Sequence, residues 1–480
     1  MFNQEGSTAR RFIYSAVFWL IVPVTYGLLL ALHLWKPDLI FPWLNPLHLS
    51  FGRLRPMHVN TVAFGWLSMA QLGAMFYIIP RLTGARLYSE RLGNWTAVIW
   101  NIAILLGNIT LALGLTQGRE YAEFIWPIDI GVMLLLAMAG YNLFKTVGRR
   151  REKQLYVSLW YFLGTFTWFP VIYFIGNVMW VTPFNAPPGA PWGGALLGVN
   201  DAIVNWFYGH NVVGLWFTTL GIGAMYYLVP KLTGNPLYSH RLSLIGFWTI
   251  AFTYIWTGTH HLVWGPVPRW TQMLAITFSV MMIIPVWTVV WNFVKTMEGK
   301  WNLILDNIPL RFLALGSITY FLVCLQGPLQ SLRSVSLTTH FTNWVPGHAH
   351  LALLATFSYV AFAAIYESLP KLVGRPLYSK ALMDWHFWLV FIGFLFFFTG
   401  FTVGGLVQGM SWNAQVPFLD VVKSIEPWSL VRAMGAALMF TGLYLFGYNV
   451  LRTARSVTSQ QQSQATPMPA VAGGSLGGAR

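Results

Sequence analysis

The sequence predicts an all-α membrane protein with about twelve transmembrane helices in three pseudo-symmetric groups of four. Three observations predict this fold. The 480-residue chain is 56% hydrophobic and only 9% charged, whereas a soluble domain has about 25% charged residues. Apolar runs of roughly 20 residues, long enough to cross a bilayer, recur along its whole length. A ten-residue sequence also occurs three times, and its three copies lie at the ends of apolar runs that are four runs apart.

The apolar runs divide the chain into a short N-terminus (residues 1–10), a membrane domain (11–455) and a tail (456–480). The tail is rich in Ser, Gln, Gly, Ala and Pro, which predicts disorder. The first run is too long for a signal-peptide core and lacks a small-residue cleavage site, so we interpret it as a retained helix. The predicted spans begin near Phe12, Pro56, Trp95, Ile125, Tyr156, Asp201, Ser243, Thr271, Ile308, Trp344, Asp384 and Trp428.

The repeated sequence organises these spans. It runs over residues 80–89, 230–239 and 370–379, and each copy begins with proline and ends with Leu-Tyr-Ser. The copies close the second, sixth and tenth spans. Three groups of four helices related by pseudo-threefold symmetry are the simplest arrangement with that spacing.

The charges predict the orientation of the chain. The net charge is +15, and segments on the side of both termini hold 21 Lys and Arg residues against 7 on the other side. By the positive-inside rule, both termini are predicted to be cytoplasmic. Topology therefore accounts for the basic charge without any nucleic acid. The single cysteine, Cys324, excludes an intrachain disulfide and a thiolate metal cluster.

Six histidines are predicted to lie at one depth in the membrane. His58 and His348 precede the repeated proline by 22 positions, and His210 and His350 precede it by 20. At about 1.5 Å per residue, these side chains share one height, in the outer third of the bilayer. The seventh span places two more, His260 and His261, near the same level. Ionisable groups inside membranes indicate function, and imidazole suits iron, copper and zinc.

Spacing divides the six into separate sites. His348 and His350 are two residues apart, so on a helix they point about 200° apart and face two different cofactors. His58 can complete a bis-histidine heme with one of them, which leaves the other as the single ligand of an open heme. Three imidazoles remain, and they suit copper or non-heme iron; they belong to His210, His260 and His261. Tyr254 precedes His261 by seven positions, which predicts the same helix face.

These residues lie in sequences that resemble the heme–copper oxidase superfamily, and closely the catalytic subunit of cbb3-type cytochrome c oxidase. The resemblance covers about Phe51 to Arg455. The stretches that carry it are FGRLRPMH ending at His58, TQGREYAE ending at Glu123, WFYGHN around His210, TYIWTGTHH ending at His261, GHAH ending at His350 and HFWLVFIGF beginning at His386.

The resemblance implies a role for each site residue. His58 and His350 would ligate a low-spin heme b, His348 a high-spin heme b, and His210, His260 and His261 copper. Tyr254 would be covalently linked to His210. Arg55 would contact heme propionates, and Glu120 would help to bind calcium. Ser243, Asn292 and Tyr320 match a proton path from the cytoplasmic side. Gln326 is a departure, since the family has a glutamate there, and it puts any carboxylate-dependent proton step in doubt.

The implied function is reduction of O2 to water in a bacterial cytoplasmic membrane, coupled to proton translocation. Electrons would come from a c-type cytochrome. The chain has no CxxCH motif, so membrane-anchored c-type cytochrome subunits would supply the covalent heme.

Two alternatives remain open. One is a nitric oxide reductase with non-heme iron at the three-histidine site. Those enzymes place glutamates there and lack the tyrosine, so Gly214 and Tyr254 favour the oxidase, while Gln326 keeps the alternative open. The other is a transporter, since many carriers have twelve spans and internal repeats, although six histidines at one level argue against it.

Overall fold

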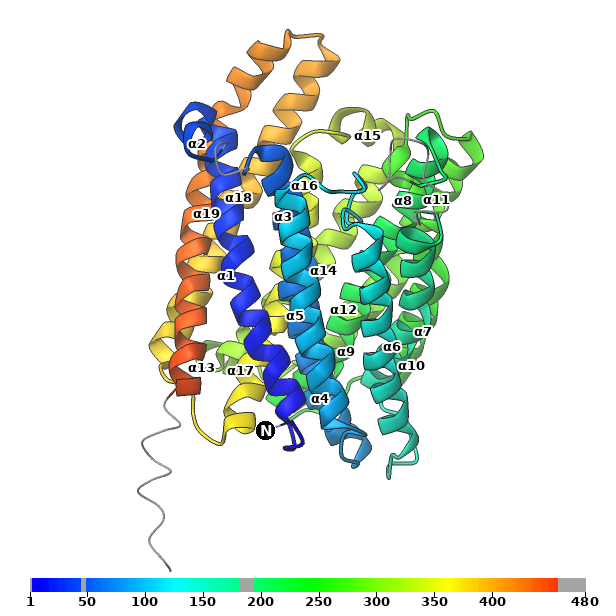
Figure 1. Cartoon of the computed structure of the whole chain (residues 1–480), viewed down its shortest axis with the longest axis vertical. Helices are drawn as coiled ribbons and strands as arrows, with labels where there is room; N and C mark the ends of the chain where they lie inside the picture. Colours follow the sequence, from blue (N-terminus) through cyan, green and yellow to red (C-terminus); the bar gives the residue numbers. More distant parts are fainter. Residues whose placement is uncertain (1, 45–48, 181–193, 456–480) are drawn as a thin grey trace, which may run out of the picture.

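The computed structural model describes residues 2–44, 49–180 and 194–455, and every regular element in these ranges is a helix (Figure 1). The elements are α1 (Ser7–Trp35), α2 (Pro37–Leu44), α3 (Phe51–Asn60), η2 (Thr61–Leu67), α4 (Ser68–Thr83), α5 (Glu90–Ala112), α6 (Trp126–Gly148), α7 (Val157–Tyr173), η3 (Phe174–Val178), α8 (Gly198–Val212), η5 (Val213–Thr218), α9 (Thr219–Thr233), α10 (His240–Thr253), η6 (Tyr254–Trp256), η7 (Gly258–Leu262), α11 (Arg269–Met281), α12 (Ile283–Thr296), α13 (Leu303–Asp306), α14 (Ile308–Ser331), α15 (Arg333–Thr339), α16 (Trp344–Ala352), η8 (Leu353–Ser358), α17 (Tyr359–Val373), α18 (Lys380–Asn413) and α19 (Phe418–Arg455).

The predicted all-helical membrane fold is confirmed. In the described ranges, eleven helices are long and apolar enough to cross a membrane. The remaining predicted span, from Ser243, is the α-helix α10 followed by the tighter 3-10 segments η6 and η7. Both ends of the described chain lie at one end of the bundle (Figure 1), which we call the near end, and the opposite end is the distal end. The predicted disordered tail lies outside the described residues.

The repeated sequence proves to be a helix–loop–helix connector. Its glycine ends α4, α9 and α17 with a left-handed backbone, at φ of 61°, 72° and 70° for Gly84, Gly234 and Gly374. Only glycine takes this conformation without steric cost, which explains its place just beyond the last helical residue. The serine that closes each copy then accepts a hydrogen bond from a backbone N–H of the next helix, 3.1–3.3 Å away. The same physical device is therefore used three times.

The threefold relation extends to a second set of helices. Asn142 of α6, Asn292 of α12 and Asn449 of α19 each make the same pair of hydrogen bonds. In each case the amide oxygen accepts from the N–H of the connector serine, and the amide nitrogen donates to its carbonyl, at 2.9–3.1 Å. These paired bonds clamp the connectors at the near end, and they support the predicted grouping by fours.

Each of the three repeated spans also contains a short π-helical segment just beyond its histidines: η2, η5 and η8. Such bulges are frequent at functional sites because the extra residue rotates the side chains that follow. Buried indole–hydroxyl bonds join the spans at the level of the bulges. Trp66 donates to Ser358 and Trp216 donates to Ser68, both at 2.9 Å. The three spans therefore form one rigid centre that holds the histidines.

Candidate metal centres

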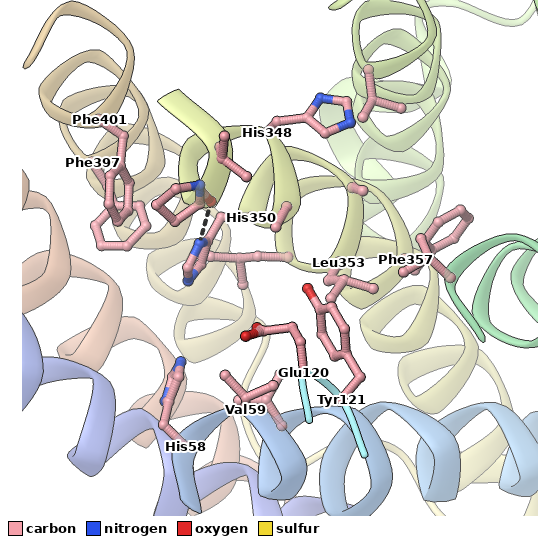
Figure 2. Close-up of a pocket in the computed structure, with 18 of the residues that line it drawn as sticks. His58, Val59, Glu120, Tyr121, His348, His350, Leu353, Phe357, Phe397 and Phe401 are labelled. Carbon is pink, nitrogen blue, oxygen red and sulfur yellow. Dashed lines mark hydrogen bonds between the residues drawn. The ribbon is translucent and has the colours of Figure 1, made fainter. Parts of the chain in front are cut away.

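One cavity of about 640 Å³ brings all six predicted histidines together. They come from α3, α8, η7 and α16, and in the described chain they share this space. The matched distances from the repeat predicted this for four of them, and the course of the seventh span predicted it for His260 and His261. In Figure 2, His58 and His350 face each other on one side of α16, and His348 points away from the opposite side of that helix. The division of the two α16 histidines between separate sites is therefore present in the geometry.

His58 and His350 face each other with a gap suited to one metal ion. Their ring centroids are 6.3 Å apart and their planes differ by 22°. An iron about 2 Å from a nitrogen of each ring requires a separation of this size. The Nδ1 atom of each ring lies 2.7 Å from a backbone carbonyl, that of Pro23 for His58 and that of Pro346 for His350. These bonds fix the tautomers and leave Nε2 free to ligate.

Helix α1 holds no candidate ligand, yet it sets the position of His58. A Cβ atom at Gly27 would lie 2.9 Å from Cε1 of the His58 ring and 3.3 Å from its Nδ1. The absent side chain at Gly27 is therefore what lets His58 lie against α1 and reach the Pro23 carbonyl. Sequence reasoning missed both residues, and a glycine in an apolar helix gave no signal.

Replacing Gly27 with alanine is expected to push the His58 ring away from Pro23. The overpacking should cost about 1–3 kcal/mol, and the low-spin heme should be lost in part or gain high-spin character. Electron paramagnetic resonance of the purified protein measures this change. Gly131→Ala is the matched control, because a Cβ there meets nothing within 4 Å. An unchanged low-spin signal in the Gly27 variant would contradict the role of α1.

The Nδ1 atom of His348 has a side chain as its hydrogen-bond partner, whereas the Nδ1 atoms of His58 and His350 have backbone carbonyls. This Nδ1 lies 2.9 Å from Oε1 of Gln326 on α14, and Gln326 is 9% exposed. The amide oxygen accepts the Nδ1 proton and leaves Nε2 directed to the cavity. Gln326, at the position where the resemblance implies a glutamate, is therefore a neutral partner of a candidate heme ligand.

The three remaining histidines form the only group of three or more potential metal ligands found in the described ranges. Their ligand nitrogens all lie within 4.8 Å of one another. Nδ1 of His210 is 3.0 Å from Nε2 of His261, close to the separation of about 3.3 Å that two nitrogens have in a tetrahedral site with 2 Å bonds. Outer contacts hold the rings: Ser279 is 2.5 Å from Nδ1 of His260, and Trp206 stacks on His261 at 3.9 Å. The donor set fits copper or non-heme iron.

Tyr254 lies beside this group, as predicted, but for a different reason. The prediction assumed two α-helical turns between Tyr254 and His261, whereas both lie in 3-10 segments, where seven residues do not return to the same face. The tyrosine instead stacks on His210, with ring centroids 4.6 Å apart and planes at 21°. It fits there because Gly214, one turn after His210, has no side chain: a Cβ would lie 1.9 Å from the phenol ring.

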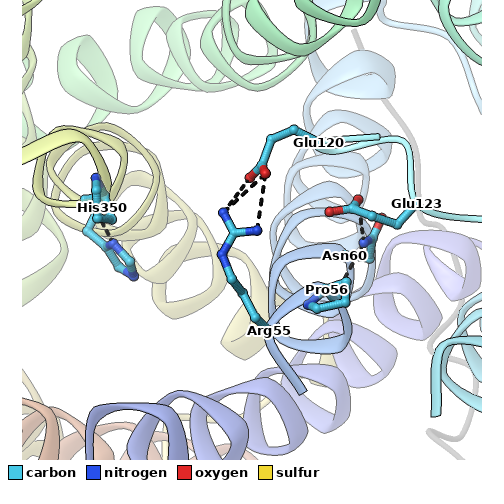
Figure 3. A network of polar contacts seen from close by, with 7 residues as sticks. Arg55, Pro56, Asn60, Glu120, Glu123 and His350 are labelled. Carbon is cyan, nitrogen blue, oxygen red and sulfur yellow. Dashed lines mark hydrogen bonds and ion pairs between the residues drawn. The ribbon is translucent and has the colours of Figure 1, made fainter. Parts of the chain in front are cut away.

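Two predicted charged residues pair with each other at the distal end. Arg55 donates to both oxygens of Glu120 at 2.8–3.1 Å (Figure 3). Nearby, the carboxylate of Glu123 accepts a hydrogen bond of 2.8 Å from Asn60 and is 5% exposed. Burial, followed by the negative charge of Glu120, raises the pKa of Glu123 to about 8. Arg55 lines the cavity, so it is placed to meet an anion there.

Sequence reasoning missed Arg432, a buried cation in the wall of the cavity. It is 3% exposed, and its Nη1 donates to Asn343 at 3.2 Å, while Nε and Nη2 have no hydrogen-bond partner among the described residues. A buried cation without an anion is costly. The arginine therefore calls for an anionic group in the cavity, such as a heme propionate. An arginine inside a predicted span was the available signal.

The three predicted proton-path residues are all buried. The burial of Asn292 is explained by a structural role, without any part in proton transfer. Asn292 makes the same connector clamp as Asn142 and Asn449, and it adds one bond, a 3.0 Å donation to Ser243. Tyr320 lines the same cavity as Tyr254.

Tyr226 was not predicted to belong to this path. Its hydroxyl is buried beside Ser243 and Asn292 without a well-aligned hydrogen bond. A tyrosine among many in the sequence carried no signal for this position.

Comparisons with known proteins agree with this geometry. The family described as Cytochrome C and Quinol oxidase polypeptide I matches residues 7–438. The chain is 33% identical to the cbb3-type cytochrome c oxidase subunit CcoN1 of Stutzerimonas stutzeri, over 95% of this chain and 97% of that protein. It is 34% identical to a cytochrome c oxidase subunit 1 homolog of Azorhizobium caulinodans, over 95% and 83%.

Two further similarities are more distant. A nitric oxide reductase chain of Stutzerimonas stutzeri is 22% identical, over 94% of this chain and 96% of that protein. A solved heme-copper terminal oxidase dimer has the same fold, with a TM-score of 0.79 at 16% identity, over 93% of this chain and 84% of that chain.

The match across nearly the whole chain, the shared fold and the three-histidine group support one conclusion. The protein is a multi-pass membrane oxidoreductase of the respiratory chain, and it belongs to the subunit I family of the heme-copper oxidases.

Proposed function

We propose that this chain reduces O2 to water at a centre formed by a high-spin heme b and copper, and that a low-spin heme b feeds electrons to that centre. His58 and His350 would hold the low-spin heme, His348 the high-spin heme, and the three-imidazole group of His210, His260 and His261 the copper. The observation that carries the proposal is the stacking of Tyr254 on His210 beside three converging imidazoles.

The residues fit the proposed cofactors in two respects. The gap between His58 and His350 matches one iron with two axial imidazoles. The unpartnered nitrogens of buried Arg432 suit a propionate in the same cavity. When bound, the hemes and copper supply electron transfer and O2 binding. The protein contributes fixed tautomers, a largely apolar wall that excludes water, and a phenol that holds a proton beside the reacting gas.

Tyr254 favours O2 over NO as the substrate. Reduction of O2 to water needs protons and electrons at the site, and a phenol can supply one of each. The same position of the ring excludes any side chain at Gly214, a position one turn from His210 where a carboxylate would otherwise reach the metal. The nitric oxide reductase alternative would require a carboxylate near non-heme iron, and the cavity lining offers only Glu120, which Arg55 holds.

Protons would reach Tyr254 from the near end through Ser243, Tyr226 and Tyr320. Each is buried, and each comes from a different helix, α10, α9 or α14. The hydroxyl of Tyr226, buried without a well-aligned hydrogen bond, supports the route, because a buried polar group that lacks a good partner is costly unless water reaches it. Asn292 would hold Ser243 in place rather than carry protons itself.

Calcium fits the described residues less well than the hemes and copper do. Glu120 is already paired with Arg55, and burial favours the protonated form of Glu123. We therefore derive no step through calcium, and Glu120 is proposed chiefly as the ion-pair partner of Arg55.

The distribution of basic residues gives the orientation of the chain, and the position of the site then gives the side on which its partners bind. We place the near end in the cytoplasm, because the excess of Lys and Arg lies on that side. The heme centres then lie near the outer face. Membrane-anchored c-type cytochrome subunits, or cytochrome c itself, would deliver electrons there, since this chain cannot attach a covalent heme of its own.

Replacing Gln326 with glutamate tests the assignment of His348. A carboxylate accepts a stronger, charge-assisted bond from Nδ1 and makes the imidazole a better donor to iron. The difference between the two kinds of hydrogen bond is about 1–2 kcal/mol, so the reduction potential of the high-spin heme should fall by on the order of 50 mV. Spectroelectrochemical titration measures it. Gln408→Glu, which changes an amide of the cavity lining that accepts from Asn343, serves as a control. A Gln326 variant with an unchanged high-spin potential would contradict the assignment.

A heme count tests the proposal as a whole. The purified complex should contain two b-type hemes per copy of this chain, one low-spin and one high-spin, in reduced-minus-oxidised spectra. One b-type heme, or none, would overturn the cofactor assignment.

A further inference from the structure

A group of buried polar side chains lies behind α8, the helix that carries His210 and begins at the distal end (Figure 1). Its members are each at most 7% exposed, and we call them the distal polar cluster: Arg119, Asp129, Tyr173, Asn177, Asn205 and Tyr208. Tyr208 and His210 are two residues apart on α8, so their side chains point about 200° apart. The cluster is therefore separate from the metal-ligating face of that helix.

Direct contacts join the cluster into one group. Oδ1 of Asp129 accepts a hydrogen bond of 2.7 Å from the hydroxyl of Tyr173, and the rings of Tyr173 and Tyr208 are 5.6 Å apart. Arg119 donates to the carbonyl of Gly176 in the π-helical segment η3. Gly176 packs against α8, because a Cβ there would lie 2.3 Å from Cβ of Tyr208. The cluster is therefore continuous across α6, α7, η3 and α8.

Several polar atoms of the cluster lack a well-aligned hydrogen bond to any described residue. They are Oδ1 of Asn177, Oδ1 of Asn205, the hydroxyl of Tyr208 and Nη2 of Arg119. Buried polar groups without good partners are costly, so a concentration of them indicates bound molecules. The amide oxygens need donors, whereas the guanidinium needs an acceptor, and its charge disfavours a metal ion. Water both donates and accepts, and it fits this mixed set.

One face of α8 leads from the cluster to the distal surface. Asp201, Asn205 and Tyr208 are spaced by four and three residues, which places them on one stripe of the helix. Tyr208 is 0% exposed and Asn205 7%, while the side chain of Asp201 is 34% exposed. Nε of Arg119 lies 3.1 Å from Oδ1 of Asp201. Asp201 therefore connects the buried cluster to the distal aqueous phase.

Asp129 is the buried carboxyl group at the inner end of the cluster. Its Oδ2 accepts a hydrogen bond of 2.5 Å from Nε2 of Gln117, and the titratable groups that act on it are Arg119, Tyr173 and Tyr208. Burial lowers the pKa of Arg119, and the negative charges of Asp201 and Asp129 oppose that shift. The loop that supplies Gln117 also places Glu120 in the lining of the cavity that contains the six histidines. Asp129 therefore lies behind a short loop that borders the metal centres.

We propose that the distal polar cluster binds a chain of water molecules that releases protons from Asp129, through Asp201, to the distal aqueous phase. This inference rests on the proposed function, because a route for protons away from the metal centres is needed only if the chain moves protons during catalysis. In each transfer a proton leaves the Asp129 carboxyl for a bound water and then passes to Asp201 or to bulk water. Asp129 returns to its anionic form near Arg119, and nothing is oxidised or reduced.

Tyr208→Phe separates water binding from packing. It removes only a hydroxyl that has no well-aligned hydrogen bond, so a purely structural role predicts an unchanged or more stable protein. A water-binding role predicts slower proton release. In proteoliposomes of the purified complex, release to the outside after a pulse of O2 should slow at least about tenfold, since a positioned proton-transfer group contributes about 10²–10⁴-fold. The b-type heme spectra should be unchanged.

Asp129→Asn removes the titrating carboxyl and keeps an oxygen that accepts from Tyr173. Proton release should slow as it does in Tyr208→Phe. Reduced-minus-oxidised infrared spectra of the parent complex should contain the C=O band of a protonated carboxyl, shifted in D2O, and this band should be missing from the variant. A purely structural carboxylate would give no such band.

Each variant has a matched control. Tyr359→Phe removes another buried hydroxyl without a hydrogen-bond partner, on α17, and Asp420→Asn makes the same change at an exposed carboxylate of α19. Both should release protons at the parental rate. Parental release in both Tyr208→Phe and Asp129→Asn would overturn the proposal, and so would a parent complex that reduces O2 without releasing protons outside. Failure of the proposed function is distinguishable, because the parent complex itself would then lack copper or two b-type signals.

Discussion

Replacing Gly214 with alanine is expected to displace Tyr254 and to reduce O2 turnover about 100-fold or more, the effect of losing a positioned proton donor. The reason is steric. The new Cβ would lie 1.9 Å from Cε1 and 2.1 Å from Cζ of the Tyr254 ring, far inside van der Waals contact. Gly214 lies in η5, which is buried among packed helices, so the backbone has little freedom to retreat. The ring of Tyr254 must therefore leave the face of His210.

Turnover with O2 and peptide mapping for a His210–Tyr254 linkage measure the change. Gly316→Ala is the control, because a Cβ at this glycine of α14 has its nearest neighbour at 3.5 Å, an ordinary contact. Full turnover of Gly214→Ala, with the linked peptide still present, would show that the tyrosine does not depend on this glycine. The same geometry makes the present position of Tyr254 and any side chain at position 214 mutually exclusive.

Replacing His260 with alanine is expected to remove the third metal and to leave both hemes in place. Loss of one of three imidazoles should abolish tight metal binding. Even mutation of residues that only hydrogen-bond to metal ligands lowers metal affinity or activity about 10–100-fold. Loss of a ligand itself should therefore lower turnover by more than about 1000-fold. The heme ligands His58, His348 and His350 lie on other elements, so the b-type spectra should persist.

Metal analysis of the purified His260 variant and its O2 uptake test this expectation. The control is His240→Gln, which changes an exposed histidine at the start of α10, on the near side of the bundle. Retention of the metal at parental stoichiometry in His260→Ala would show that the three-imidazole group is not the binding site.

The sequence predicted the fold and the histidine layer because both depend on periodic features. A polar residue in an apolar span is conspicuous, and the repeated proline supplied a common reference height for four of the six histidines. Helical geometry then separated His348 from His350. These relations involve only regular helices, for which distance along the chain determines position in space.

Features that depend on irregular backbone or on absent atoms were not predictable in this way. The 3-10 segments η6 and η7 changed the faces presented by Tyr254 and His261, so the predicted contact arose from packing instead. Gly27 and Gly214 act through missing side chains, which a sequence does not distinguish from other helix glycines. The role of Asn292 became clear only when its bonds proved identical to those of Asn142 and Asn449.

The pairing of charges was equally hidden. Arg55 was expected to face propionates and Glu120 calcium, yet they hold each other across 65 residues of chain. Arg432, by contrast, has two unpartnered nitrogens in the cavity wall and is the stronger candidate for an anionic group of a heme. Such partners lie on different helices, and no local pattern records them.

The central claim is that the gas is O2 and that the third metal is copper. The most direct test is metal analysis of the purified complex combined with turnover on O2 and on NO. We expect one copper and two heme irons per chain, with no further iron, and fast reduction of O2 with slow reduction of NO. Three irons per chain without copper, together with fast reduction of NO and slow reduction of O2, would contradict it.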